Sequence, residues 1–421
     1  MLNGHKIRHF SPKNQNNFGK SAKDLKLLVF LQKNSGFVCP FYLFSEMYPI
    51  GLYIHIPFCK SRCLYCDFYS TVGSGLQARY VDALVRELMM RKSDMEGHRL
   101  KTIYLGGGTP SLLSMELLGK LFYNIYNVYG AFLDDDMEVT IECNPDDVTE
   151  TYAEGLRRLP VNRVSMGAQT FDDARLRFVR RRHKSTDVAR AVRRLRQAGI
   201  GNISLDLMFG FPDETLADVR SDIDALLSLD VEHVSAYSLM YEEGTPLTRM
   251  MERGEVSPID DELSRQMYAL LSESLAAAGY EHYEISNWAR PGFHSRHNSS
   301  YWHDVPYIGI GAAAHSYDQA TRSWNDADLS GYIDAIEAGR RPFGQEAIDG
   351  KTRYNDLITT ALRTKDGIEV DSLQEPFRSF LVRSAAPAIS RKLLALDGGR
   401  LHLTREGIFV SDSVFADLIY L

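Results

Sequence analysis

Long apolar runs are missing from this sequence of 421 residues. The nearest candidates, Leu27–Leu31 and Phe37–Phe44, are short and interrupted, whereas a membrane-spanning helix needs about 18 apolar residues or more. Neither follows the charged start, or precedes the small-residue cleavage site, of a secretory signal. We therefore predict neither a membrane span nor a secretory signal.

An excess of positive charge is missing as well. The chain has 48 Lys and Arg against 55 Asp and Glu, a net charge of −7 and a pI near 6.0. Nucleic-acid-binding proteins usually show a basic excess, so we predict no nucleic-acid partner. With 44% hydrophobic and 24% charged residues, the composition is that of an ordinary globular protein with two or three domains.

Cysteine is scarce, and its distribution is uneven. Of five cysteines, Cys59, Cys63 and Cys66 fall within eight residues, while Cys39 and Cys143 stand apart. An odd number with this clustering does not resemble a disulfide framework and favours a metal site in a reducing compartment. We therefore predict a cytoplasmic protein.

Residues 1–46 differ from the rest, with seven Lys and Arg, two acidic residues and several polar stretches. We interpret them as a poorly ordered extension, or as upstream sequence joined by a wrong start site. Met47, just before the first strong strand pattern, is a plausible true start. A mitochondrial presequence would be richer in Arg and poorer in Lys and Asp.

From about residue 50, short β-rich runs alternate with helical patterns. Such alternation indicates βαβ units, and six of them predict an α/β fold with a partial (β/α)6 barrel over residues 47–290. The predicted strands are Leu52–Ile56, Thr102–Leu105, Glu138–Glu142, Arg163–Met166, Asn202–Leu207 and His233–Leu239. Helical patterns between them include Gln77–Lys92, Asp187–Ala198 and Leu216–Leu229.

The alternation stops after Leu239. Helical patterns cover Glu262–Ala278 and Leu329–Ala338, and residues 291–349 read as a connecting segment. Residues 350–421 predict a small winged-helix-like domain. Its pattern is two helices at Arg353–Leu362 and Ala388–Leu396, then a hairpin-like turn at residues 398–404 and a final apolar helix.

The three clustered cysteines have the spacing C-x3-C-x2-C. Thiolates are soft ligands that suit iron–sulfur clusters and zinc. Structural zinc takes four ligands, and no second cysteine pair exists, although a zinc site completed by His55 or another histidine stays an alternative. Three cysteines on one loop can hold three irons of a [4Fe–4S] cubane and leave the fourth iron open for a small molecule.

Polar and glycine residues recur where successive strands end. Gly106-Gly107-Gly108-Thr109 follows the second strand, and glycines let a ligand approach the backbone closely. Glu142, Gln169 and Asp206 lie at or near the ends of the next three strands, where buried polar groups need partners. A shared polar ligand explains them most simply, and separate structural hydrogen bonds are the alternative.

The loop and these motifs resemble the radical S-adenosylmethionine superfamily, and Tyr53–Cys59 looks like its coproporphyrinogen oxidase-like branch. The resemblance implies that S-adenosylmethionine occupies the open iron. Arg181 lies in a basic segment that could equally be a solvated face, but it matches a cofactor-contacting position. The residues expected to contact the cofactor are Tyr53, Tyr65, Gly107, Gly108, Thr109, Glu142, Gln169, Arg181 and Asp206.

Three features distinguish branches within this superfamily. Phe68 stands where the oxidase has a fourth cysteine, and no N-terminal arm of the oxidase type is present. The motif His297-Asn-x-x-Tyr-Trp302 resembles the haem chaperone branch, HemW. The resemblance implies a haem chaperone that gives haem to an acceptor protein, with a membrane-associated protein among the candidates.

His297 is the predicted haem contact. His315 is the second choice, followed by His282, His294 and His303, although a histidine in an aromatic loop is often structural. Two alternatives remain at this point. One is a radical enzyme acting on a porphyrinogen, such as an oxygen-independent coproporphyrinogen III dehydrogenase. The other is a cluster-bearing structural protein without a haem role.

Overall fold

The structure is a computed structural model that describes residues 47–73 and 75–421. The predicted N-terminal extension, residues 1–46, lies outside the described residues, as does Cys39.

Six parallel strands form the central part of the main sheet, each at a place where the sequence predicts one. They pair in chain order, which confirms the predicted α/β fold with six barrel strands. Their apolar side chains are almost all buried, as expected for parallel strands covered on both faces. The strands are β1 (Tyr48–Ile56), β4 (His98–Gly107), β5 (Leu133–Cys143), β6 (Arg163–Gln169), β7 (Asn202–Phe209) and β8 (His233–Ser238).

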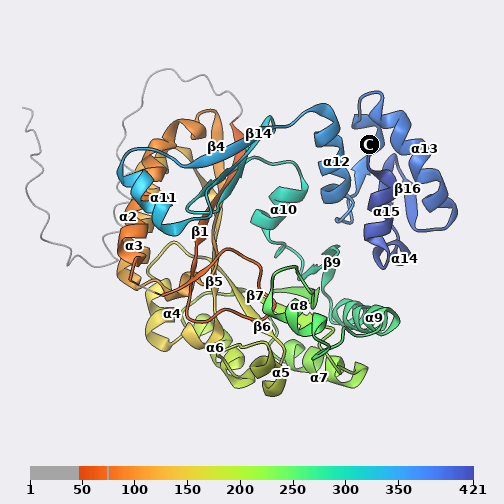
Figure 1. The fold of residues 1–421 in the computed structure, drawn as a ribbon, viewed down its shortest axis with the longest axis horizontal. Coiled ribbons are helices and arrows are strands. Elements are labelled where there is room, and N and C mark those ends of the chain that lie inside the picture. The colour runs from red at the N-terminus through yellow and green to blue at the C-terminus, as the bar shows by residue number, and fades with distance from the viewer. Residues whose placement is uncertain (1–46, 74) are drawn as a thin grey trace, which may run out of the picture. The chain divides into compact units, whose positions relative to one another are not determined.

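Helices connect these strands and follow one another around their outside (Figure 1). Four of them begin at a Ser, Thr or Asp whose side chain accepts a backbone N–H of the first turn: Ser114, Thr149, Asp172 and Thr215. The helices are α2 (Gln77–Met90), α3 (Met115–Tyr129), α4 (Glu150–Leu156), α5 (Asp173–Phe178), α6 (Ser185–Gln197) and α7 (Leu216–Leu227). The apolar faces of α2, α3, α4, α6 and α7 join the strands in one large core.

The sheet continues past both edge strands of the barrel, β1 and β8, which the sequence patterns did not predict. β11 (Tyr307–Ile310) pairs in parallel with β1, and β12 (His315–Tyr317), β13 (Thr321–Asn325) and β14 (Phe343–Ala347) follow antiparallel. Past β8 come β10 (Asn287–Ala289) and β9 (Glu281–Glu284). Twelve of the strands in the described residues thus form one sheet. The accompanying helices are α8 (Pro246–Glu252), α9 (Asp261–Ala277), α10 (Arg296–Trp302) and α11 (Leu329–Glu337).

The C-terminal residues surround a second hydrophobic cluster. It contains the three-stranded sheet β15 (Ile368–Glu369), β17 (Arg400–Leu403) and β16 (Leu394–Asp397), with α12 (Gly350–Ala361), α13 (Phe377–Ser390), α14 (Arg405–Ile408) and α15 (Ser411–Leu418). An ion pair between Arg363 and Glu284, 2.7 Å long, joins this part to β9.

One predicted helix in this region is wrong. The sequence pattern extends a helix over Ala388–Leu396, but α13 ends at Ser390 and Leu394 begins a strand. Leu394–Asp397 pairs with Arg400–Leu403 across the turn at Gly398 and Gly399, both of which have positive φ. Cross-strand hydrogen bonds therefore override the apolar period of these residues.

Candidate functional site

The cysteine loop follows β2 (Phe58–Cys59) and leads to β3 (Thr71–Val72), the two strands of a separate small sheet. Leu64 anchors the loop: its side chain is buried in a cluster with Val179 and Leu247. Its backbone also forms two hydrogen bonds. Leu64 N–H donates to Val179 O at 3.3 Å, and Leu247 N–H donates to Leu64 O at 3.0 Å. An apolar residue between the cysteines thus fixes the loop while the thiols stay at the surface of a cavity.

A carboxylate ties this loop to its neighbours. Asp147 accepts from Lys60 at 2.9 Å, from the Ser111 hydroxyl at 2.9 Å and from Arg182 at 3.1 Å. These three partners lie in the cysteine loop, just after the glycine turn and in the basic segment, respectively. Asp147 therefore connects three segments that are distant in the sequence.

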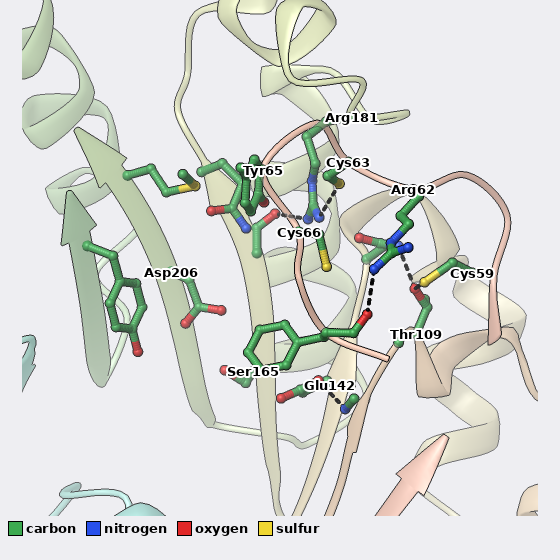
Figure 2. Close-up of a pocket in the computed structure, with 18 of the residues that line it drawn as sticks. Cys59, Arg62, Cys63, Tyr65, Cys66, Thr109, Glu142, Ser165, Arg181 and Asp206 are labelled. Atoms are coloured by element: carbon green, nitrogen blue, oxygen red, sulfur yellow. Dashed lines mark hydrogen bonds between the residues drawn. The ribbon is translucent and has the colours of Figure 1, made fainter. Parts of the chain in front are cut away.

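All three cysteines line one cavity of about 500 Å³. Figure 2 shows Cys59, Cys63 and Cys66 at one end of it, with Glu142, Ser165 and Asp206 on the strands that form its wall. Cys59 Sγ lies 3.6 Å from Thr109 Oγ1, and Cys63 Sγ accepts from Arg181 Nη1 at 3.7 Å. Most of the predicted cofactor contacts are among the lining residues: Tyr65, Gly107, Gly108, Thr109, Glu142, Gln169, Arg181 and Asp206.

The glycine turn at the end of β4 touches the loop that carries the first cysteine. Gly108 N–H donates to Ile56 O at 2.9 Å. A Cβ on Gly108 would lie 2.9 Å from both Ile56 O and Phe58 O, closer than real Cβ contacts allow. Gly107 has φ +108°, and a Cβ there would overlap the His55 ring at 2.4 Å. Both positions therefore require glycine for steric reasons alone.

Two carboxylates that face the cavity have raised pKa values. Burial raises the pKa of Glu142 to about 7, although hydrogen bonds from the Tyr104 hydroxyl and Gly107 N–H oppose the rise. Burial also raises the pKa of Asp206 to about 6, against the lowering effects of Arg163 and of the Ser235 and Ser165 hydroxyls. A cation or hydrogen-bond donor on a ligand would favour their ionised forms.

Arg181 is directed inward and does not belong to a solvated face. Its Nη2 donates to Gly167 O at 2.6 Å, while its Nε has no hydrogen-bond partner among the described residues. Gln169 ends β6 with φ +66°, and its side chain is buried. Arg182, by contrast, pairs with Asp146 at 2.7 Å.

Tyr53 and His297 are not among the residues that line the cavity. The Tyr53 hydroxyl lies 2.9 Å from His55 Nδ1, and the His297 ring stacks against Tyr104 with centroids 5.0 Å apart. His297 is 1% exposed. Both its ring nitrogens have partners: Nδ1 is 2.8 Å from Thr102 Oγ1, and Nε2 is 2.8 Å from Tyr301 Oη. Burial lowers the pKa of His297 to about 3, so the ring is neutral.

The other predicted haem candidates differ in exposure. His315 is exposed on β12, and His303 is half exposed beyond the end of α10. His282 stacks on Trp288 with centroids 4.5 Å apart, and His294 stacks on Tyr283 at 4.1 Å. Stacked rings at these distances have the packing expected of structural residues.

Sequence reasoning missed several lining residues, among them Tyr104, Arg163, Ser165, Tyr237 and Asn298. Arg163, Ser165, Gly167 and Gln169 alternate along β6, so a polar residue at every second position could have indicated this face. The position of Asn298 on α10 depends on tertiary packing and left no such signal.

A site for a single metal ion would need several ligands that converge on one point. Among residues 47–73 and 75–421, no three His, Cys, Asp or Glu side chains converge on a position for a single ion. His55, the residue considered for zinc, contacts Tyr53 and Tyr69 instead. Three separate thiols around an open cavity fit a larger group, in which each thiolate binds a different iron.

A three-thiol loop at the end of a barrel of six parallel strands, beside a glycine turn and polar strand ends, defines a radical S-adenosylmethionine protein. The model of the radical SAM superfamily matches residues 53–226, and that of the HemN C-terminal domain matches residues 348–410. This fold implies a [4Fe–4S] cluster and S-adenosylmethionine.

The chain belongs to the heme chaperone HemW family. It is 34% identical to heme chaperone HemW of Lactococcus lactis over 371 residues, which cover 87% of this chain and 96% of the relative. It is 36% identical to heme chaperone HemW of Bacillus subtilis, covering 86% and 97% of the two chains. The fold is similar to that of Escherichia coli coproporphyrinogen III oxidase, with a TM-score of 0.77, 18% identity, and 89% and 91% of the two chains covered.

Among residues 47–73 and 75–421, every helix is too short or too polar to span a bilayer.

Proposed function

We propose that this protein binds haem and transfers it to an acceptor protein, and that it carries a [4Fe–4S] cluster with S-adenosylmethionine at the open iron. The observation that carries the cofactor part is that Cys59, Cys63 and Cys66 line the same cavity as the glycine turn and the polar strand ends. Membership of the HemW family supports the haem part.

In this proposal the three cysteines each bind one iron, and the cluster supplies a one-electron redox centre. Arg181, beside Cys63, is suited to a carboxylate, because a guanidinium can donate two parallel hydrogen bonds. Glu142 and Asp206 are suited to cationic or hydroxyl groups of the same ligand. Gly107, Gly108 and Thr109 leave room beside the cluster, and Tyr65 and Gln169 complete the wall of the cavity. Tyr53 supports this wall from outside the cavity, where its ring stacks on Tyr104.

His297 remains our proposed haem contact, and its surroundings define what contact requires. A haem iron could reach Nε2 only after the hydrogen bond to Tyr301 breaks, and α10 is held by the Glu138 carboxylate, which accepts from His297 N–H at 2.9 Å. Haem binding through His297 therefore requires α10 to move. His315, exposed without such a movement, is the residue to test beside it.

We also propose that the protein works in the cytoplasm, where clustered thiols stay reduced. Haem and an acceptor protein are the proposed partners, with membrane-associated proteins among the acceptors to be tested. Nucleic acid is not a proposed partner of this acidic chain.

The cofactor assignment is tested by anaerobic reconstitution followed by iron and sulfide analysis. We expect about four irons per chain in the wild type and a large loss in Cys63→Ala. Cys143→Ala is the matched control, because Cys143 also borders the cavity but is buried in the hydrophobic core and lies outside the C-x3-C-x2-C loop. Loss of the cluster in Cys143→Ala but not in Cys63→Ala would contradict the assignment.

The chaperone function is tested by titrating the reconstituted protein with haem and then offering the complex to membranes or to apo-acceptor proteins. We expect stoichiometric haem that survives chromatography and moves to an acceptor. His297→Ala and His315→Ala identify the contact by a changed haem absorption spectrum. A wild type that retains no haem would refute the proposal.

A parallel assay addresses the enzyme alternative. The reduced, reconstituted protein is supplied with S-adenosylmethionine and coproporphyrinogen III, and we expect no protoporphyrinogen. Turnover would show a porphyrinogen-converting enzyme instead of a haem chaperone.

A further inference from the structure

Arg163 begins β6 and reaches the cavity from its floor. Its exposed fraction is 1%, yet it is one of the residues that line the cavity. Neither Nε nor Nη1 has a hydrogen-bond partner among the described residues, and no carboxylate of these residues lies within 4.0 Å of the Arg163 guanidinium. A buried guanidinium without a hydrogen bond or an ion pair is costly, because no close contact replaces the water that the charge has lost.

Another buried arginine shows how this chain normally satisfies such a charge. Arg91 pairs with Asp94 at 2.8 Å and donates to Gly309 O and Ser316 Oγ, both at 2.9 Å. Arg163 has none of these contacts, although it lines a cavity large enough for a ligand. The difference indicates that the partner of Arg163 comes from outside the chain.

Two acidic side chains of the wall lie near Arg163. Glu142 accepts from Tyr104 at 2.7 Å and from Gly107 at 3.2 Å, and the Ser165 and Ser235 hydroxyls are close enough to Asp206 to lower its pKa. Arg163 is close enough to lower the pKa of both, but too far for an ion pair with either. The positive charge on the floor is therefore available to an incoming anion.

Arg163 lies deeper in the cavity than the cysteines do. Arg181 contacts both Cys63 and Gly167 O, whereas Arg163 lies four residues before Gly167 on β6, about 13 Å along the strand. A carboxylate held near the cysteines would meet Arg181. Arg163 is placed for a second carboxylate at the other end of the cavity.

We propose that Arg163 binds a carboxylate of a ligand that occupies this cavity, and that a haem propionate is the carboxylate it receives. This inference rests on the proposed haem-binding function. The guanidinium fork suits a carboxylate because it can donate two parallel hydrogen bonds. The carboxylate of S-adenosylmethionine is the other source of the same chemistry, and the experiment separates the two.

The test compares haem with haem dimethyl ester, whose propionates carry no charge, on reconstituted wild type and Arg163→Met. We expect the substitution to weaken haem binding by roughly 10- to 100-fold and to leave binding of the ester unchanged. A second arm compares S-adenosylmethionine with its decarboxylated form. A loss confined to S-adenosylmethionine would support the carboxylate site with that cofactor as its source. Equal losses for acid and ester, or no loss in either arm, would overturn the proposal.

Thermal unfolding without ligand guards against a purely structural role. We expect Arg163→Met to melt at or above the wild-type temperature, because a buried charge without partners is removed. Arg91→Met is the matched control and should melt well below it, because it removes the ion pair with Asp94 and two buried hydrogen bonds, to Gly309 O and Ser316 Oγ. A fall in Arg163→Met as large as that in Arg91→Met would make Arg163 structural and refute the proposal. If wild type binds neither haem nor its ester, the haem function fails, while the second arm still tests Arg163.

Discussion

A single methyl group at Gly108 is the sharpest perturbation of the cysteine loop. In Gly108→Ala the new Cβ would lie 2.9 Å from Ile56 O, 2.9 Å from Phe58 O and 3.0 Å from Phe58 N. These distances are about 0.5 Å below the lower limit of ordinary van der Waals contact. All three neighbours are backbone atoms, which cannot rotate away. The backbone just before Cys59 must therefore shift.

We expect this overpacking to lower the free energy of unfolding by about 1–3 kcal/mol. Because the displaced Phe58 immediately precedes Cys59, the same shift moves the first thiol, so less iron should be retained after reconstitution. Urea unfolding followed by circular dichroism measures the first effect, and iron analysis per chain measures the second.

Gly119→Ala is the matched control for this substitution. Gly119 lies inside α3, where a Cβ meets no atom within 4 Å, so alanine should raise the free energy of unfolding by about 0.5–1 kcal/mol. A Gly108→Ala protein with wild-type stability and a full complement of iron would refute the steric reasoning, as would an equal loss in Gly119→Ala.

Three further predictions concern other parts of the molecule. Since the pKa of Glu142 is raised to about 7, the carboxylate is neutralised as pH falls through 7, and equilibrium dialysis should show S-adenosylmethionine binding weakening by up to about tenfold per unit below that pH. Glu142→Gln should bind more weakly but lose most of this dependence above pH 6, and an unchanged pH profile would contradict the role of Glu142. Glu87 is fully buried and accepts hydrogen bonds from Gly311 N–H at 2.9 Å, Asn325 Nδ2 at 2.8 Å and the Tyr332 hydroxyl at 2.5 Å. Glu87→Ala should therefore lower the free energy of unfolding in urea by about 3–5 kcal/mol. A loss under about 1 kcal/mol would be inconsistent with this network. Leu64→Ala should cost about 2–4 kcal/mol and release iron faster to a chelator, and unchanged release would show that Leu64 does not anchor the cysteine loop.

Much of the site was predictable because its signals are local. A thiol spacing of three and two residues, a run of three glycines and a polar residue at a strand end are each readable within a few positions. The parallel order of the strands then brings their ends to one edge, which is why eight of the predicted cofactor contacts line one cavity with the three cysteines. Tyr53 and His297 came from resemblance, and the structure places both outside that lining.

The sequence by itself thus determined the six barrel strands, three of the helices between them and the cysteine loop, because hydrophobic period and short motifs encode them directly. Only the tertiary structure decided that β11 pairs with β1, since Gly51 and Tyr307 are paired although they are far apart in the sequence. It also decided that α10 places His297 between Thr102 and Tyr301, and that Arg163 reaches the cavity without a partner. These features depend on contacts between distant residues, and whether a buried charge is paired is a property of the assembled neighbourhood and not of its own strand.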